Sequence, residues 1–109
     1  MITHIVMFRL KEFETPQLKT AHMAAIKQSL EGLAGKLPTV LFLSVDFNAN
    51  PAEKWDVILT SRFDSWESLE AYASHPEHRA VVNEVIAPVC IDRACVDYVS
   101  DGRHEDHKL

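Results

Sequence analysis

The stretch that decides the fold is residues 2–10, which read ITHIVMFRL. Its β-branched and aromatic residues are typical of a strand, in which neighbouring side chains point to opposite faces of the sheet. One face then carries His4, Val6, Phe8 and Leu10, and the other carries Ile5, Met7 and Arg9. Apolar residues occur on both faces, so we expect a strand that is covered on both sides.

A helix is expected to follow this strand. Thr15 is suited to cap its N-terminus, and Pro16 to occupy its first position, where no backbone N–H is needed. Small and apolar residues then recur with helical period, in a stripe made of Leu18, Ala21, Ala25, Ile26, Ser29 and Leu33. Gly32 and Gly35 mark the end of the helix.

The remaining chain alternates between strand and helix patterns. Further strands are expected at residues 40–47, 55–63 and 92–99. Asp64, followed three residues later by Glu67, predicts a capped helix start. Pro76 disfavours helical geometry at His75, so this second helical region should break there and begin again at Pro76.

The predicted order is β-α-β-β-α-β, the ferredoxin-like arrangement of the α+β class, with four antiparallel strands and two helices on one face. Residues 1–100 form this domain, and residues 101–109 form a polar tail. Two helices can cover only one face of the sheet, whereas the first three strands are apolar on both. We therefore predict a homodimer through the second sheet face, a dimeric α+β barrel.

Composition narrows the possible functions. The chain has 109 residues, 47% apolar and 25% charged, which fits one globular domain. A core of this size leaves little room for an enclosed pocket, so any pocket is expected to depend on the dimer. The net charge of −5, without a concentrated basic face, argues against binding to nucleic acid or to an anionic membrane.

Cysteine and glycine usage adds further expectations. Cys90 and Cys95 lack the C-x-x-C spacing of a redox or zinc site, and the first residues resemble neither a signal peptide nor a membrane span. Two reduced thiols predict a cytoplasmic protein. Three glycines form no phosphate-binding loop, which argues against nucleotide-dependent chemistry. Neither a cofactor nor a metal is expected.

The six histidines are the candidate acid–base groups near neutral pH. His4 projects among apolar strand residues, and His22 lies in the middle of the helix stripe. Each is either a ligand contact or a structural histidine with satisfied hydrogen bonds. His104 and His107, in the tail, fit solvated side chains better than a metal site, because no further ligands lie nearby in the sequence.

The densest cluster is residues 72–78, YASHPEH. The break at Pro76 lets Tyr72 and His78 approach one space from two helical segments. A neutral imidazole can accept a proton from carbon, and a phenol can polarise a carbonyl group. In the structural alternative, His75 caps a helix and Tyr72 is a rim residue. A metal site at His75 and His78 is disfavoured, because no third ligand is evident.

Three motifs resemble the stress-responsive A/B barrel (Dabb) family over the whole chain except the tail. They are ITHIVMF at residues 2–8, SHPEH at 74–78, and Pro88-Val89 followed by DRACVDY at 92–98. The resemblance implies a dimeric α+β barrel, in a family whose members mostly have no assigned activity. One plant member is a cofactor-free polyketide cyclase, whose catalytic tyrosine and histidine correspond to Tyr72 and His78, with a pocket histidine at His4.

Three functional hypotheses follow, and they leave open whether the protein is an enzyme. The first is a homodimer of unassigned activity that binds a small organic molecule between sheet and helices. The second is a cofactor-independent polyketide cyclase, lyase or isomerase acting on a ketone or enol, with His78 and Tyr72 as catalytic residues. The third is a cofactor-independent monooxygenase. The expected ligand contacts are His4, Val6, Phe8, His22 and Leu59.

Overall fold

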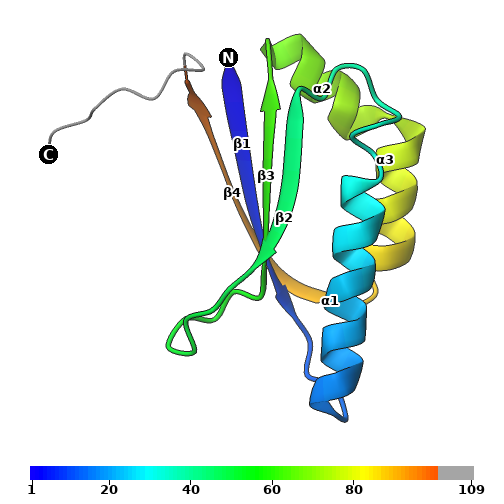
Figure 1. Cartoon of the computed structure of the whole chain (residues 1–109), viewed down its shortest axis with the longest axis vertical. Helices are drawn as coiled ribbons and strands as arrows, with labels where there is room; N and C mark the ends of the chain where they lie inside the picture. Colours follow the sequence, from blue (N-terminus) through cyan, green and yellow to red (C-terminus); the bar gives the residue numbers. More distant parts are fainter. Residues whose placement is uncertain (101–109) are drawn as a thin grey trace, which may run out of the picture.

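Strand β1 (Ile2–Leu10) lies inside a four-stranded antiparallel sheet of order β2-β3-β1-β4 (Figure 1). The computed structural model describes residues 1–100; the predicted tail, with His104 and His107, lies outside the described residues. The other strands are β2 (Phe42–Phe47), β3 (Val57–Phe63) and β4 (Cys90–Val99). The predicted four-stranded ferredoxin-like α+β fold is confirmed.

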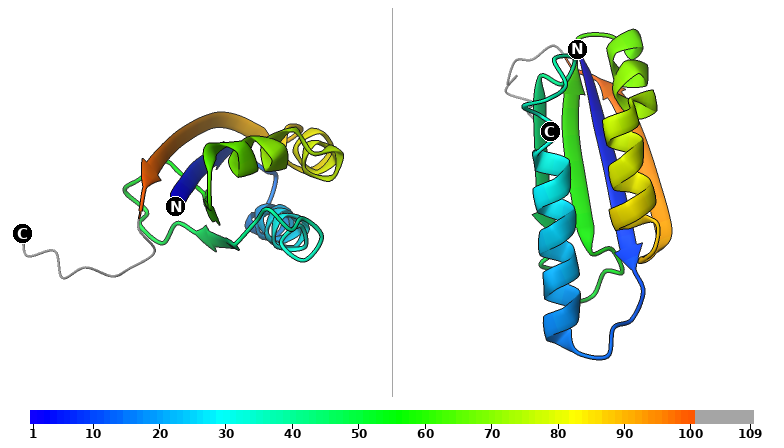
Figure 2. Two further views of the ribbon diagram at one scale, coloured as in Figure 1. Left: turned by 90° about the horizontal axis from the view of Figure 1, so that it is seen from above. Right: turned by 90° about the vertical axis from the view of Figure 1, so that its right-hand side faces the viewer.

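The helices all lie on one face of this sheet (Figure 2). They are α1 (Pro16–Glu31), α2 (Trp66–Ser74) and α3 (Pro76–Val81), which continues as a short π-helix, η1 (Val82–Ile86). The predicted break at His75 is confirmed, because the backbone of this residue is extended and separates α2 from α3. Its Nδ1 accepts a hydrogen bond from the Glu77 N–H at 3.1 Å, so His75 caps α3.

The start of α2 differs from the prediction by one residue. The predicted cap is Asp64, but Ser65 takes that place, and its hydroxyl accepts from the Ser68 N–H at 3.1 Å. The Asp64 carboxylate instead accepts a 2.6 Å hydrogen bond from the Ser68 hydroxyl, which lowers the pKa of Asp64. The short serine side chains thus perform the capping expected of Asp64 and Glu67.

The buried face of α1 is also displaced from the predicted stripe. Ile26, Leu30 and Leu33 are fully buried against the sheet, whereas Leu18 is 45% exposed. The first turns of α1 lie beyond the end of β1 (Figure 1). His22, expected in the middle of the helix stripe, is exposed, and its ring stacks on Phe13 at 4.7 Å between centroids.

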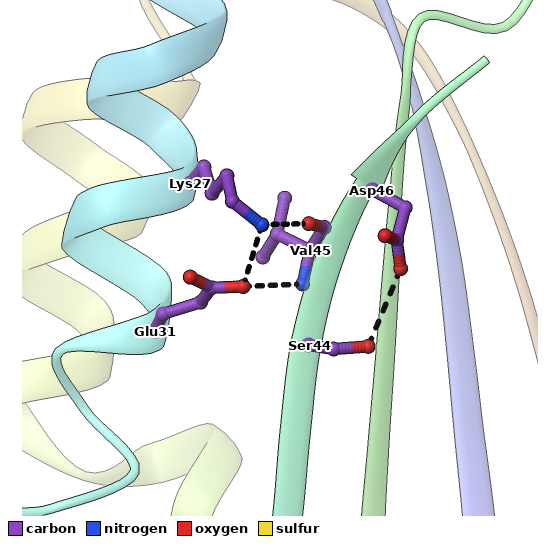
Figure 3. Close-up of polar contacts among 5 residues, drawn as sticks. All are labelled: Lys27, Glu31, Ser44, Val45 and Asp46. Carbon is purple, nitrogen blue, oxygen red and sulfur yellow. Dashed lines mark hydrogen bonds and ion pairs between the residues drawn. The ribbon is translucent and has the colours of Figure 1, made fainter. Parts of the chain in front are cut away.

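The edge strand β2 is tied to α1 by a polar contact (Figure 3). Glu31 accepts from the Val45 N–H at 3.1 Å, and the Lys27 ammonium donates to the Val45 carbonyl at 2.5 Å. Lys27 also pairs with Glu31 at 2.8 Å, which lowers the pKa of Glu31. These bonds satisfy backbone groups that a free sheet edge would expose, and they hold the helix over the sheet.

The sheet face opposite the helices carries apolar side chains. By strand alternation and register this outer face includes Ile5, Met7, Phe42, Ile58, Val96 and Tyr98. Phe42, Val96 and Tyr98 are each more than 40% exposed. The prediction of strands that are apolar on both faces is confirmed. Among residues 1–100, no helix has the length and apolarity to cross a membrane.

Candidate functional site

A cavity of about 450 Å³ lies between the inner face of the sheet and the helices. Its wall includes His4, Val6, Phe8, Leu59, Tyr72 and His78. This volume falls within the range of small-molecule sites, about 300–1,000 Å³. The expectation that so short a chain has little room for a pocket is wrong, because one chain alone lines a cavity of this volume.

Tyr72 is placed in this wall by the last turn of α2. The side chain is 1% exposed, and its ring packs on Phe63 at 5.3 Å between centroids and on His78 at 4.3 Å. Within the described chain, its buried hydroxyl has no hydrogen-bond partner. Burial raises the pKa of Tyr72 well above its usual value, so the phenol keeps its proton. A ligand oxygen in the cavity can accept that proton as a hydrogen bond.

His78 approaches from the first turns of α3, on the other side of the Pro76 break. Its Nδ1 lies 2.9 Å from the Ala73 carbonyl oxygen, which can only accept a hydrogen bond. Nδ1 therefore carries the proton, and in the neutral ring Nε2 keeps its lone pair. Burial lowers the pKa of His78, with the charges of His4, Arg79 and Arg93 acting in the same direction. The imidazole is thus neutral near pH 7 and able to act as a base.

His4 reaches the cavity from β1 and contacts β4 at the same time. Its Nδ1 forms a short contact with the Asp97 carboxylate, and the Cys95 Sγ lies 3.6 Å from the same nitrogen. Asp97 is directly opposite His4 in the β1–β4 register, which places the two side chains on one face. The carboxylate fixes the orientation of the ring.

The structure places all but one of the predicted site residues in the cavity wall. His4, Val6, Phe8, Leu59, Tyr72 and His78 all line the same cavity. His22 does not; it is exposed on α1, and its ring stacks on Phe13.

Arg93 and Cys90 also line the cavity and were missed. Arg93 lies opposite Phe8 in the β1–β4 register, and residues opposite each other share a face of the sheet. The pairing of these two strands is therefore the signal that could have placed Arg93 beside Phe8.

Comparison with known proteins gives a family match over the described fold. The family model for the stress responsive A/B barrel domain matches residues 2–100. The chain belongs to this family. This A/B barrel domain is also 33% identical over 103 residues to a stress-response A/B barrel domain-containing protein of Arabidopsis thaliana. The match covers 93% of the chain and 37% of the relative, so the chain spans little more than a third of that protein.

Solved structures show the same fold. A dimeric ferredoxin-like protein of unknown function from Bacteroides fragilis is 36% identical, with a TM-score of 0.81 over 89% of this A/B barrel domain and 93% of that chain. The hydroxynitrile lyase of Passiflora edulis has a TM-score of 0.75 at 16% identity, over 95% and 96% of the two chains. At that identity the likeness concerns the fold alone.

Proposed function

We propose that this protein is a homodimer whose cavity binds a small carbonyl compound and catalyses proton transfer without a cofactor, as in a lyase, isomerase or cyclase. One observation carries this proposal. Among residues 1–100 the buried Tyr72 hydroxyl has no hydrogen-bond partner, and it shares an apolar cavity with His78, whose Nδ1 carries the proton and whose Nε2 keeps its lone pair. Buried polar groups normally have partners, so a ligand oxygen is the expected partner of Tyr72.

The proton transfer would follow from this geometry. His78 Nε2 removes a proton from the carbon next to a carbonyl group, and the electron pair of that C–H bond forms the enolate. The Tyr72 O–H donates a hydrogen bond to the enolate oxygen as charge develops there. Return of the proton from Nε2 to a different carbon completes an isomerisation. In an elimination the leaving group departs with its bonding electron pair as the enolate collapses, and it takes up the proton from Nε2.

The cavity wall favours a particular class of ligand. Val6, Phe8 and Leu59 present apolar surface, whereas Arg93 is a cationic side chain in the wall. A ketone with an aromatic or aliphatic body therefore fits better than a sugar or a nucleotide. An anionic group on the ligand would be attracted by Arg93.

The homodimer is proposed from the outer sheet face. Its apolar side chains would be covered by the same face of a second copy, related by a two-fold axis. The dimeric protein of Bacteroides fragilis, which is 36% identical, supports a dimer. We place the protein in the cytoplasm, where Cys90 and Cys95 would remain reduced as the free thiols found here.

The decisive experiment measures deuterium incorporation into a panel of aromatic and aliphatic ketones in D₂O, with and without the protein. We expect exchange at the carbon next to the carbonyl above the uncatalysed rate. Loss of the base in His78→Gln should reduce exchange by about 10²–10⁴-fold, the usual contribution of general base catalysis. Tyr72→Phe, which removes one hydrogen-bond donor, should reduce it by about 10²–10³-fold.

Two control variants match these changes. Tyr98→Phe alters the other tyrosine, on the outer face, and His22→Gln alters a histidine outside the cavity. Both should exchange ketones at the wild-type rate. Ligands that bind by thermal shift and native mass spectrometry, yet show no exchange above background with any ketone, would overturn catalysis and leave a binding protein. Oxygen consumption with a bound ligand would instead indicate a monooxygenase.

A further inference from the structure

Three side chains with metal-binding atoms converge where β1 meets β4. They are His4, Cys95 and Asp97, and their Nδ1, Sγ and carboxylate oxygen atoms all lie within 4.8 Å of one another. The register explains the convergence: Asp97 is opposite His4, and Cys95 is opposite Val6 on the same face of the sheet. The cluster therefore rests on two hydrogen-bonded strands rather than on a loop.

We propose that His4, Cys95 and Asp97 form a binding site for Zn²⁺. Imidazole nitrogen, thiolate sulfur and carboxylate oxygen are the three ligand types that zinc takes in proteins. A site with three protein ligands keeps the fourth tetrahedral position for water or another ligand. Cys95 and Asp97 are exposed, which gives the ion a path from solvent.

The spacing of the donor atoms fits a tetrahedral ion. Bonds of about 2.3 Å to sulfur and about 2.0 Å to nitrogen place these two atoms about 3.5 Å apart around zinc. The Sγ of Cys95 lies 3.6 Å from Nδ1 of His4 and 4.0 Å from Oδ2 of Asp97. Nδ1 of His4 and the carboxylate oxygen of Asp97 lie closer together than two ligands of one tetrahedral zinc ion would. A small rotation of these two side chains would make room for the ion between them.

Zinc would replace the contact that His4 and Asp97 make with each other. Nδ1 would give up the proton that it shares with Asp97 to solvent while Nε2 holds the ring proton, so that the Nδ1 lone pair and a carboxylate oxygen bind the ion. Cys95 would likewise lose its thiol proton to solvent as sulfur becomes a thiolate ligand. No oxidation change is involved. The test for zinc does not depend on the proposed proton transfer, because zinc binding is measured directly and without any ketone.

The sequence pattern offered no sign of this site. Cys95 and Asp97 are two residues apart, but His4 is contributed from the opposite end of the chain. Local motifs such as C-x-x-C or paired histidines therefore cannot detect it. Only the pairing of the first and last strands brings the donors together.

The test uses the full chain, reduced, stripped of metal with a chelator and dialysed. Isothermal titration with ZnCl₂ should give one Zn²⁺ per chain, and Co²⁺ should give the thiolate-to-cobalt charge-transfer band of a cysteine ligand. Cys95→Ser should remove that band and weaken zinc binding by at least tenfold. Asp97→Asn, which preserves side-chain shape, should also weaken binding by at least tenfold.

Matched controls separate this site from other donors. Cys90→Ser alters the other cysteine, and the double variant His104→Gln/His107→Gln removes the tail histidines; both should keep one zinc per chain and the cobalt band. Wild-type affinity in Cys95→Ser, or loss of binding in the tail variant alone, would overturn the proposal. Circular dichroism of each variant establishes that a loss of zinc is not a loss of fold.

Discussion

The two faces of the sheet differ in how their apolar surface is covered. The inner face is closed by three helices and still leaves a cavity of about 450 Å³ with Tyr72, His78 and His4 in its wall. The outer face bears exposed Phe42, Val96 and Tyr98 and has no covering element in the described chain. The difference teaches that the candidate site is assembled within one chain, whereas the outer face is suited to a second copy.

The largest expected effect is on the inner face. Phe63 is fully buried and packs on Tyr72, so Phe63→Ala should lower the free energy of unfolding by about 3–5 kcal/mol. Phe42→Ala removes the same side chain from the outer face, where it is 44% exposed, and should cost about 1 kcal/mol or less at low protein concentration. Urea unfolding followed by tryptophan fluorescence measures both.

Measurements at several protein concentrations make the comparison of these two variants more specific. Any stabilisation that the outer face gains from a second copy must grow with concentration, by mass action. The cost of Phe42→Ala should therefore rise with concentration, whereas that of Phe63→Ala should not. Equal costs for the two variants at every concentration would contradict the distinction between the faces.

The next effect concerns the proposed dimer. Val96 is 54% exposed on the outer face, and Val96→Glu would bury one unpaired charge from each subunit in a two-fold interface. The dissociation constant should rise by at least about a hundredfold, as measured by analytical ultracentrifugation. Trp66→Glu is the matched control, because Trp66 is 53% exposed on α2, away from the sheet face. A wild-type dimer in Val96→Glu would mean that another surface forms the interface.

The apolar character of both sheet faces could be predicted from the sequence. Side chains along a strand alternate between the two faces, and this alternation does not depend on distant contacts. The same alternation places Val6, Phe8 and His4 together, and all three line the cavity. The helix prediction was weaker. The stripe on α1 rests on local periodicity alone, so nothing in it revealed that His22 is exposed or that the first turns of α1 lie beyond the end of β1.

The parts that escaped prediction depend on long-range register. Arg93 joins the cavity, and Cys95 and Asp97 join His4, only because β4 pairs with β1 in one particular register. The cavity volume was also misjudged. Length limits how much core a chain can bury, but it does not show how completely the packed strands and helices fill that core.

The smallest of the three effects is a pH response that the outer face should not share. Burial lowers the pKa of His78 below its ordinary value of 6.5, with His4 on β1, Arg93 on β4 and Arg79 on α3 adding positive charge, while the buried Tyr72 stays neutral. The native state therefore favours neutral His78. Stability that is complete above pH 6.5 should be lost as the pH falls through the lower folded-state pKa.

Thermal unfolding from about pH 8 to about pH 5, with a chelator present, tests this predicted loss of stability at low pH. Wild type should lose more stability on acidification than His78→Gln, which has no ring to protonate, and His22→Gln should follow wild type. Ketone exchange should fall about tenfold per pH unit below the same pKa, because only neutral His78 accepts the proton. Identical pH dependence of stability in wild type and His78→Gln would show that burial does not lower the pKa of His78. The inner face would then lack the neutral base that distinguishes it from the outer face.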